Sequence, residues 1–129
     1  MSDENDNRTE HLMEHLANYA EGITTALLTL PIPIELPHGH GLVEEFLPAV
    51  IRAYDIMDEQ PIPRMQQVIA RAALLHWITG AELILSYVVT GKTHRADGAL
   101  INLLTGEQIL ADLIEWLVDP EGGEAPDED

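Results

Sequence analysis

The sequence predicts an all-α protein with four principal helices, and three observations support this prediction. The longest apolar run, residues 65–90, repeats at the helical period. Three further segments, separated by prolines and glycines, have apolar residues at spacings of three and four. No segment shows the alternation that is typical of a half-buried strand. We therefore expect an orthogonal or up-down bundle around a long central helix at 65–90.

The chain is long enough for one domain with its own core. Of its 129 residues, 8–119 are expected to fold as a single helical domain. The acidic ends, 1–7 and 120–129, have little to bury and are expected to be disordered. The absence of cysteine excludes disulfides, thiolate catalysis and cysteine-ligated zinc. Because no secretory signal pattern opens the sequence, we expect a cytoplasmic protein.

The net charge of −17 is the most unusual property of the chain. Residues 119–129 contain six acidic residues and no basic one. Such a field repels nucleic acid and anionic membranes and attracts basic protein surfaces, so we expect neither direct nucleic-acid binding nor membrane binding. The acidic ends either bind a partner or only keep the protein soluble.

The first helix is expected from about Arg8 to Leu30, where Pro31 ends it. Its apolar positions share one face and are expected to be buried: Leu12, Leu16, Tyr19, Ala20, Ile23, Ala26, Leu27 and Leu30. Residues 31–41 contain three prolines and two glycines, which exclude regular structure. We expect an extended segment packed along the bundle.

The second helix is expected from about Leu42 to Asp58, with a kink at Pro48. A short return at 60–63 leads into the central helix, with Pro63 suited to its first turn. Residues 91–98 are expected to form a turn and 98–104 a short helical or irregular lead-in. Thr105 and Gln108 fit a capping box at the start of the last helix, which Pro120 ends.

The central helix is expected to be buried on most sides. Small residues one heptad apart allow a neighbouring backbone to approach closely. Residues expected in the core or at a dimer contact are Ala73, Trp77, Gly80, Ile84 and Tyr87. The central helix spans about 40 Å and the second only about 26 Å. Either the central helix breaks near Thr79–Gly80, or a second copy of the chain covers it; we favour a homodimer.

Two histidine pairs are candidates for metal binding. His11 and His15 lie in the sequence His-Leu-Met-Glu-His, which matches an inverted zinc-peptidase motif, and histidines at i and i+4 share a helix face. His38 and His40 lie in the extended segment and could complete four imidazoles if that segment folds back. The alternative, which we favour, is two separate exposed pairs with no metal.

The basic cluster Lys92, Thr93, His94 and Arg95 precedes a helix and could hold an anion. Alternatively, Lys92 offsets the dipole at the end of the central helix. His76 and Glu82 within the apolar run favour a protein core over a membrane span. No Ser/His/Asp set and no catalytic carboxylate pair is recognisable, so we expect neither an enzyme nor a cofactor.

These observations favour a small acidic protein-interaction module that occupies a basic surface of a partner. Inhibitors, immunity proteins and anti-defence proteins of viruses or mobile elements share this physical description. The residues expected to contact the partner are Glu44, Glu45, Asp55, Asp58 and Glu59. The alternative is a dimeric structural or assembly protein, a scaffold or chaperone, that contacts its partners through apolar helix faces.

Overall fold

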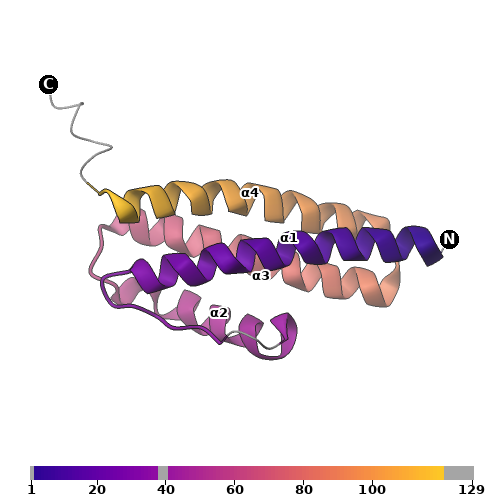
Figure 1. The fold of residues 1–129 in the computed structure, drawn as a ribbon, viewed down its shortest axis with the longest axis horizontal. Coiled ribbons are helices and arrows are strands. Elements are labelled where there is room, and N and C mark those ends of the chain that lie inside the picture. The colour runs from indigo at the N-terminus through magenta and orange to yellow at the C-terminus, as the bar shows by residue number, and fades with distance from the viewer. Residues whose placement is uncertain (1, 38–40, 121–129) are drawn as a thin grey trace, which may run out of the picture.

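The computed structural model describes residues 2–37 and 41–120, and these are helix, turn, bend or irregular segment (Figure 1). The order is α1 (Ser2–Thr29), the π-helical turn η1 (Leu42–Phe46), α2 (Leu47–Asp55), the 3₁₀ turn η2 (Met57–Glu59), α3 (Arg64–Thr90) and α4 (Thr93–Val118). No strand occurs in the described ranges, which confirms the all-α prediction.

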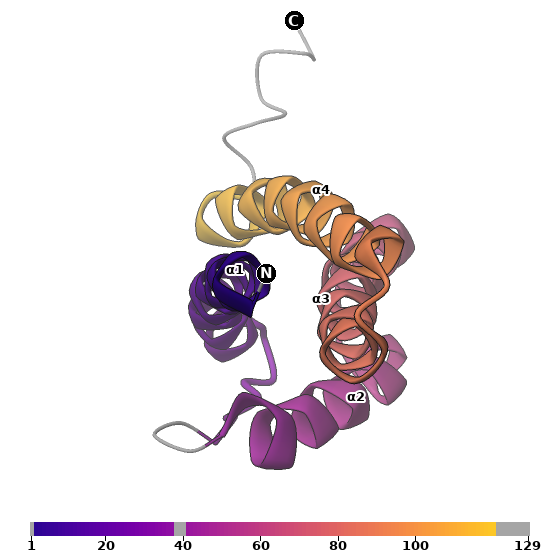
Figure 2. The same cartoon turned by 90° about the vertical axis from the view of Figure 1, so that its right-hand side faces the viewer.

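Three long helices form the bundle and the short α2 covers one half of it. Helices α1, α3 and α4 extend along the long axis, and α3 runs opposite to the other two (Figure 1). Viewed along that axis, α4 lies beside both α1 and α3, while α2 lies below α3 (Figure 2). All eight apolar positions predicted for the first helix are buried.

Two buried aromatic side chains join α1 and α3 reciprocally. The Tyr19 hydroxyl on α1 donates to the main-chain oxygen of Ala73 on α3. The Trp77 indole on α3 donates to the main-chain oxygen of Leu16 on α1, at 3.0 Å. Burial, with a smaller contribution from the Glu107 carboxylate, raises the pKa of Tyr19, so its hydroxyl stays protonated and able to donate.

Glycines let α4 approach its neighbours closely. A Cβ at Gly106 would overlap the Tyr19 hydroxyl and lie 2.6 Å from His76 Cβ. A Cβ at Gly80 on α3 would lie 2.6 Å from Leu103 on α4. These two positions lack a side chain because a neighbouring helix occupies that space.

Two predicted helix starts are wrong. Helix α1 begins at Ser2, six residues before the expected start. The carboxylates of Glu4 and Asp6, near its N-terminus, stabilise the helix by interacting with its dipole. Helix α4 begins at Thr93, so the connection from α3 is only Gly91 and Lys92. Gly91 ends α3 in the left-handed conformation, with φ 72°. The predicted capping box at Thr105 lies inside α4.

The predicted second helix is divided into three parts. Pro48 stands at the first turn of α2, and the wider turn η1 precedes it. A proline ring clashes with the carbonyl four residues earlier in an α-helix, and a π turn relieves this clash. The predicted kink is therefore a change of helix type. Helix α3, in contrast, is continuous through Thr79 and Gly80.

We predict that Gly106→Ala lowers the free energy of unfolding by about 2 kcal/mol, because the new methyl group displaces Tyr19 and overpacks the core. Gly98→Ala on the same helix is the control. Its Cβ would lie 3.3 Å from Leu83, and the gain in helix propensity offsets this contact. Urea unfolding of both variants measures the difference in the free energy of unfolding. Equal stabilities would contradict the close packing of Gly106 against Tyr19.

Candidate protein-interaction surface

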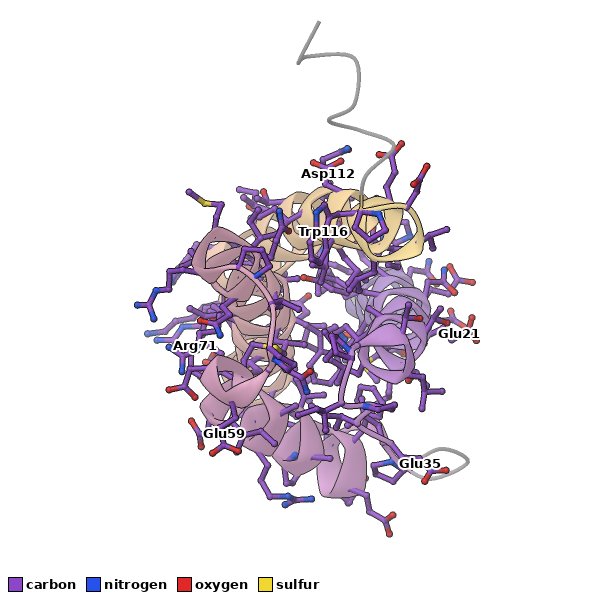
Figure 3. All side chains as sticks on the ribbon, turned by 90° about the vertical axis from the view of Figure 1, so that its left-hand side faces the viewer. Glu21, Glu35, Glu59, Arg71, Asp112 and Trp116 are labelled. Atoms are coloured by element: carbon purple, nitrogen blue, oxygen red, sulfur yellow. The ribbon has the colours of Figure 1, made fainter. Side chains whose placement is uncertain are left out.

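The five acidic residues expected to contact a partner are all exposed and belong to one short part of the fold. Glu44 and Glu45 lie in η1, Asp55 ends α2, and Asp58 and Glu59 lie in η2. We call this set the acidic surface. Figure 3 shows Glu59 projecting from this part of the molecule, well apart from Glu21 on α1 and Asp112 on α4.

The acidic surface is anchored to the core at both ends of α2. Phe46 of η1 is buried and packs edge-on against Trp77, with ring centroids 5.2 Å apart. Met57 of η2 is fully buried. Gln67 of α3 donates to the main-chain oxygens of Asp58, at 3.2 Å, and Gln60, at 3.0 Å. The carboxylates are thus carried on a backbone held at several points.

Two arginines reduce the local negative charge. Arg52 is exposed on α2 between the two groups of carboxylates. Arg71 of α3 approaches Asp58 at 3.8 Å and lies over the Tyr54 ring, 5.4 Å from its centroid. An exposed pair at this distance contributes little stability. The acidic surface therefore stays net negative, with Arg71 at its edge.

A groove borders the acidic surface on the side of residues 31–37, which we call the strap. The strap has no regular secondary structure, with bends at residues 31 and 32; its Leu36 is buried, whereas Ile32 is exposed. Buried Gln60 bonds both main-chain groups of Ile32, at 3.1 and 2.7 Å. The groove, about 450 Å³ in volume, lies between the strap and α2 and is lined by Ile34, Glu35, Leu36, Pro37, Ala49, Arg52, Ala53, Asp55 and Ile56.

The sequence did not predict this groove or the role of Gln60. Ala49 and Ala53, four residues apart, are the available signal, because small residues on one helix face leave room for another chain segment. The two alanines form a groove only because the strap returns alongside α2, and no local sequence pattern specifies that path.

Of the two histidine pairs, His11 and His15 lie within the described residues. His11 is exposed, and its ring meets that of His15 edge-on at 4.8 Å. His15 faces α4, with Nδ1 3.8 Å from a Glu107 oxygen. The strap lies on the α2 side, and His38 and His40 fall outside the described residues. Within the described ranges, no group of three or more potential ligands could hold a metal ion.

The residues of the basic cluster do not all face the same side. Lys92 and Thr93 are exposed at the start of α4, with no side-chain cap there. The Arg95 guanidinium instead donates to the Ser86 hydroxyl on α3. This contact turns Arg95, one of the four residues of the basic cluster, towards α3.

The five residues predicted for the core or a dimer contact, Ala73, Trp77, Gly80, Ile84 and Tyr87, are buried within one chain. In the described part of the chain, α3 alone is long and apolar enough to cross a membrane. Core helices of soluble proteins pass the same test, and α3 packs against α1, α2 and α4. The absence of membrane binding stays a prediction.

Comparison with known proteins gives no relative from which function could be inferred. No family model, curated protein or solved structure matches this chain. Function is therefore inferred from the geometry and charge of the molecule itself.

We predict that Gln60→Ala lowers the free energy of unfolding by about 1–2 kcal/mol, because the amide and carbonyl of Ile32 lose their partners. Gln66→Ala, at a half-exposed position in the first turn of α3, serves as the control and should change stability by less than about 0.5 kcal/mol. Urea unfolding compares the two. An unchanged Gln60→Ala protein would show that the strap is held by other contacts.

Proposed function

We propose that this protein is a small acidic interaction module that inhibits a partner by occupying its basic surface. One observation supports this most directly: all five carboxylates of the acidic surface are exposed on a short element anchored by buried Phe46 and Met57. Carboxylates on an anchored backbone can meet cationic groups with little loss of conformational freedom. Complementary charge speeds the encounter and excludes whatever the basic surface normally binds.

Such a module needs no catalytic step, metal or cofactor. An immunity or anti-defence protein needs only to cover its target, and the net charge of −17 suits a target that normally binds a polyanion. Affinity capture from the host, read by mass spectrometry, would identify the partner for the measurements below.

We predict that neutralising the acidic surface weakens partner binding by about 30-fold, from five exposed charge contacts of roughly 0.4 kcal/mol each. The variant combines Glu44→Gln, Glu45→Gln, Asp55→Asn, Asp58→Asn and Glu59→Gln. The matched control removes the same charge from exposed positions on α1 and α4: Glu10→Gln, Glu14→Gln, Glu21→Gln, Asp112→Asn and Glu115→Gln.

Isothermal titration calorimetry at low and physiological salt measures both variants. The control should bind within about threefold of the original protein, and the affinity of the original should fall as salt rises. An affinity independent of salt, or an equal loss in both variants, would reject the acidic surface as the binding site.

The second candidate is a dimeric structural or assembly protein that uses apolar helix faces. One observation favours it: nine of the twelve large, exposed apolar side chains in the described ranges lie on α3 and α4. Neutralising the five carboxylates of the acidic surface, as in the variant above, separates the two functions. An inhibitor that uses charge loses affinity, whereas a scaffold that uses apolar faces binds its partner as before.

A further inference from the structure

One side of α3 is turned away from the rest of the molecule. In Figures 2 and 3, α3 forms one flank of the bundle, with no element outside it. We call this side the outer face of α3 and define it by Val68, Arg71, Leu75, Thr79, Glu82 and Val89. These residues recur at spacings of three, four and seven, so they form one stripe along the helix.

The outer face has apolar side chains that no other part of the same chain covers. Val68 is 49% exposed, Leu75 46% and Val89 84%. Only 44% of the most apolar 18-residue segment of α3 is buried. Exposed apolar side chains that recur along one stripe of a helix make that stripe a candidate contact with another molecule.

The outer face is also nearly free of charge. The chain has 23 acidic and 6 basic residues, yet residues 65–90 contain just Arg71 and Glu82. The two charges cancel. Two copies of a protein with net charge −17 repel each other over most of their surface, and this stripe is where they can approach most closely.

From this pattern we infer that two copies of the chain associate through the outer faces of α3, antiparallel, across a two-fold axis between His76 and Trp77. In this register, Arg71 of each copy lies opposite Glu82 of the other. The two residues are eleven apart, close to three helical turns, so both project from the same side. A parallel pairing would instead set Arg71 against Arg71 and Glu82 against Glu82.

The antiparallel register also matches the apolar positions. The two Leu75 side chains meet near the axis, each beside Thr79 of the other copy. Val68 faces Leu85 of the second copy, and Leu85 is itself exposed. Because the interface is two-fold symmetric, each of these contacts forms twice.

Arg71 is already positioned for an ion pair. Its guanidinium is held over Tyr54 and beside Asp58, and about one third of the side chain is exposed. Figure 3 shows Arg71 pointing outward from α3. A side chain held in place by its own subunit loses less conformational entropy on pairing.

The size of the contact indicates a weak, reversible dimer. A helix face about 40 Å long and 10 Å wide offers roughly 400 Å² per copy. Both copies together bury about 800 Å², below the roughly 1,200 Å² of stable complexes. We therefore expect a dissociation constant in the micromolar range. The inference does not depend on the proposed function, since its test uses the chain alone.

Sedimentation velocity of the full chain over a range of concentrations tests this dimer. The original protein should shift from monomer to dimer in the micromolar range. Arg71→Glu and Glu82→Arg should each weaken association at least tenfold, because each sets like charges face to face. An equimolar mixture of the two variants should restore dimers, since every charge pair in the heterodimer is then attractive.

A pair of apolar substitutions distinguishes association through this face from nonspecific hydrophobic association. Leu75→Glu should abolish the dimer, whereas Leu104→Glu, at a similarly exposed position on α4, should leave it intact. Circular dichroism verifies that each variant is folded. A protein that stays monomeric at several hundred micromolar overturns the inference, and so does a mixture of the two charge variants that does not associate.

Discussion

The reciprocal hydrogen bonds between α1 and α3 are the constraint on which the rest of this structure depends. Tyr19 and Trp77 each bury a polar donor in an apolar core and direct it to a carbonyl of the opposite helix. A slip of one helix along the other would leave both donors buried without partners, at a cost of about 1–3 kcal/mol each. The two bonds therefore specify one register for α1 on α3.

The position of α4 follows from that register. Gly106 leaves the space that the Tyr19 ring occupies, and Gly80 leaves the space for Leu103. Once α1, α3 and α4 are packed, α3 is enclosed on the sides that face its neighbours. The short α2 covers only one half of the bundle, so the side of α3 that faces outward is left to solvent or to another molecule (Figures 1 and 2).

The surface is divided by charge in a way that follows from this packing. Acidic residues are exposed on α1, α4 and the segment from η1 to η2, while α3 has one acid and one arginine beyond its first residue. The exposure of Glu44, Glu45, Asp55, Asp58 and Glu59 was predictable, because each falls outside the apolar stripe of an amphipathic segment. The position of Arg71 beside Asp58 was not, because it requires α2 and α3 to meet at one particular angle.

What the sequence determined by itself is the helical character of the chain and the buried face of each helix, because apolar periodicity is a local property that any water-soluble packing must satisfy. The prolines at 31 and 63 likewise set helix boundaries through their own geometry. Only the tertiary structure decided that Gly98 and Gly106 lie within a continuous helix and that the strap returns beside α2. Glycine weakens an isolated helix, and the presence of Gly106 inside α4 is explained by the side chains of Tyr19 and His76, which fill the space beside it.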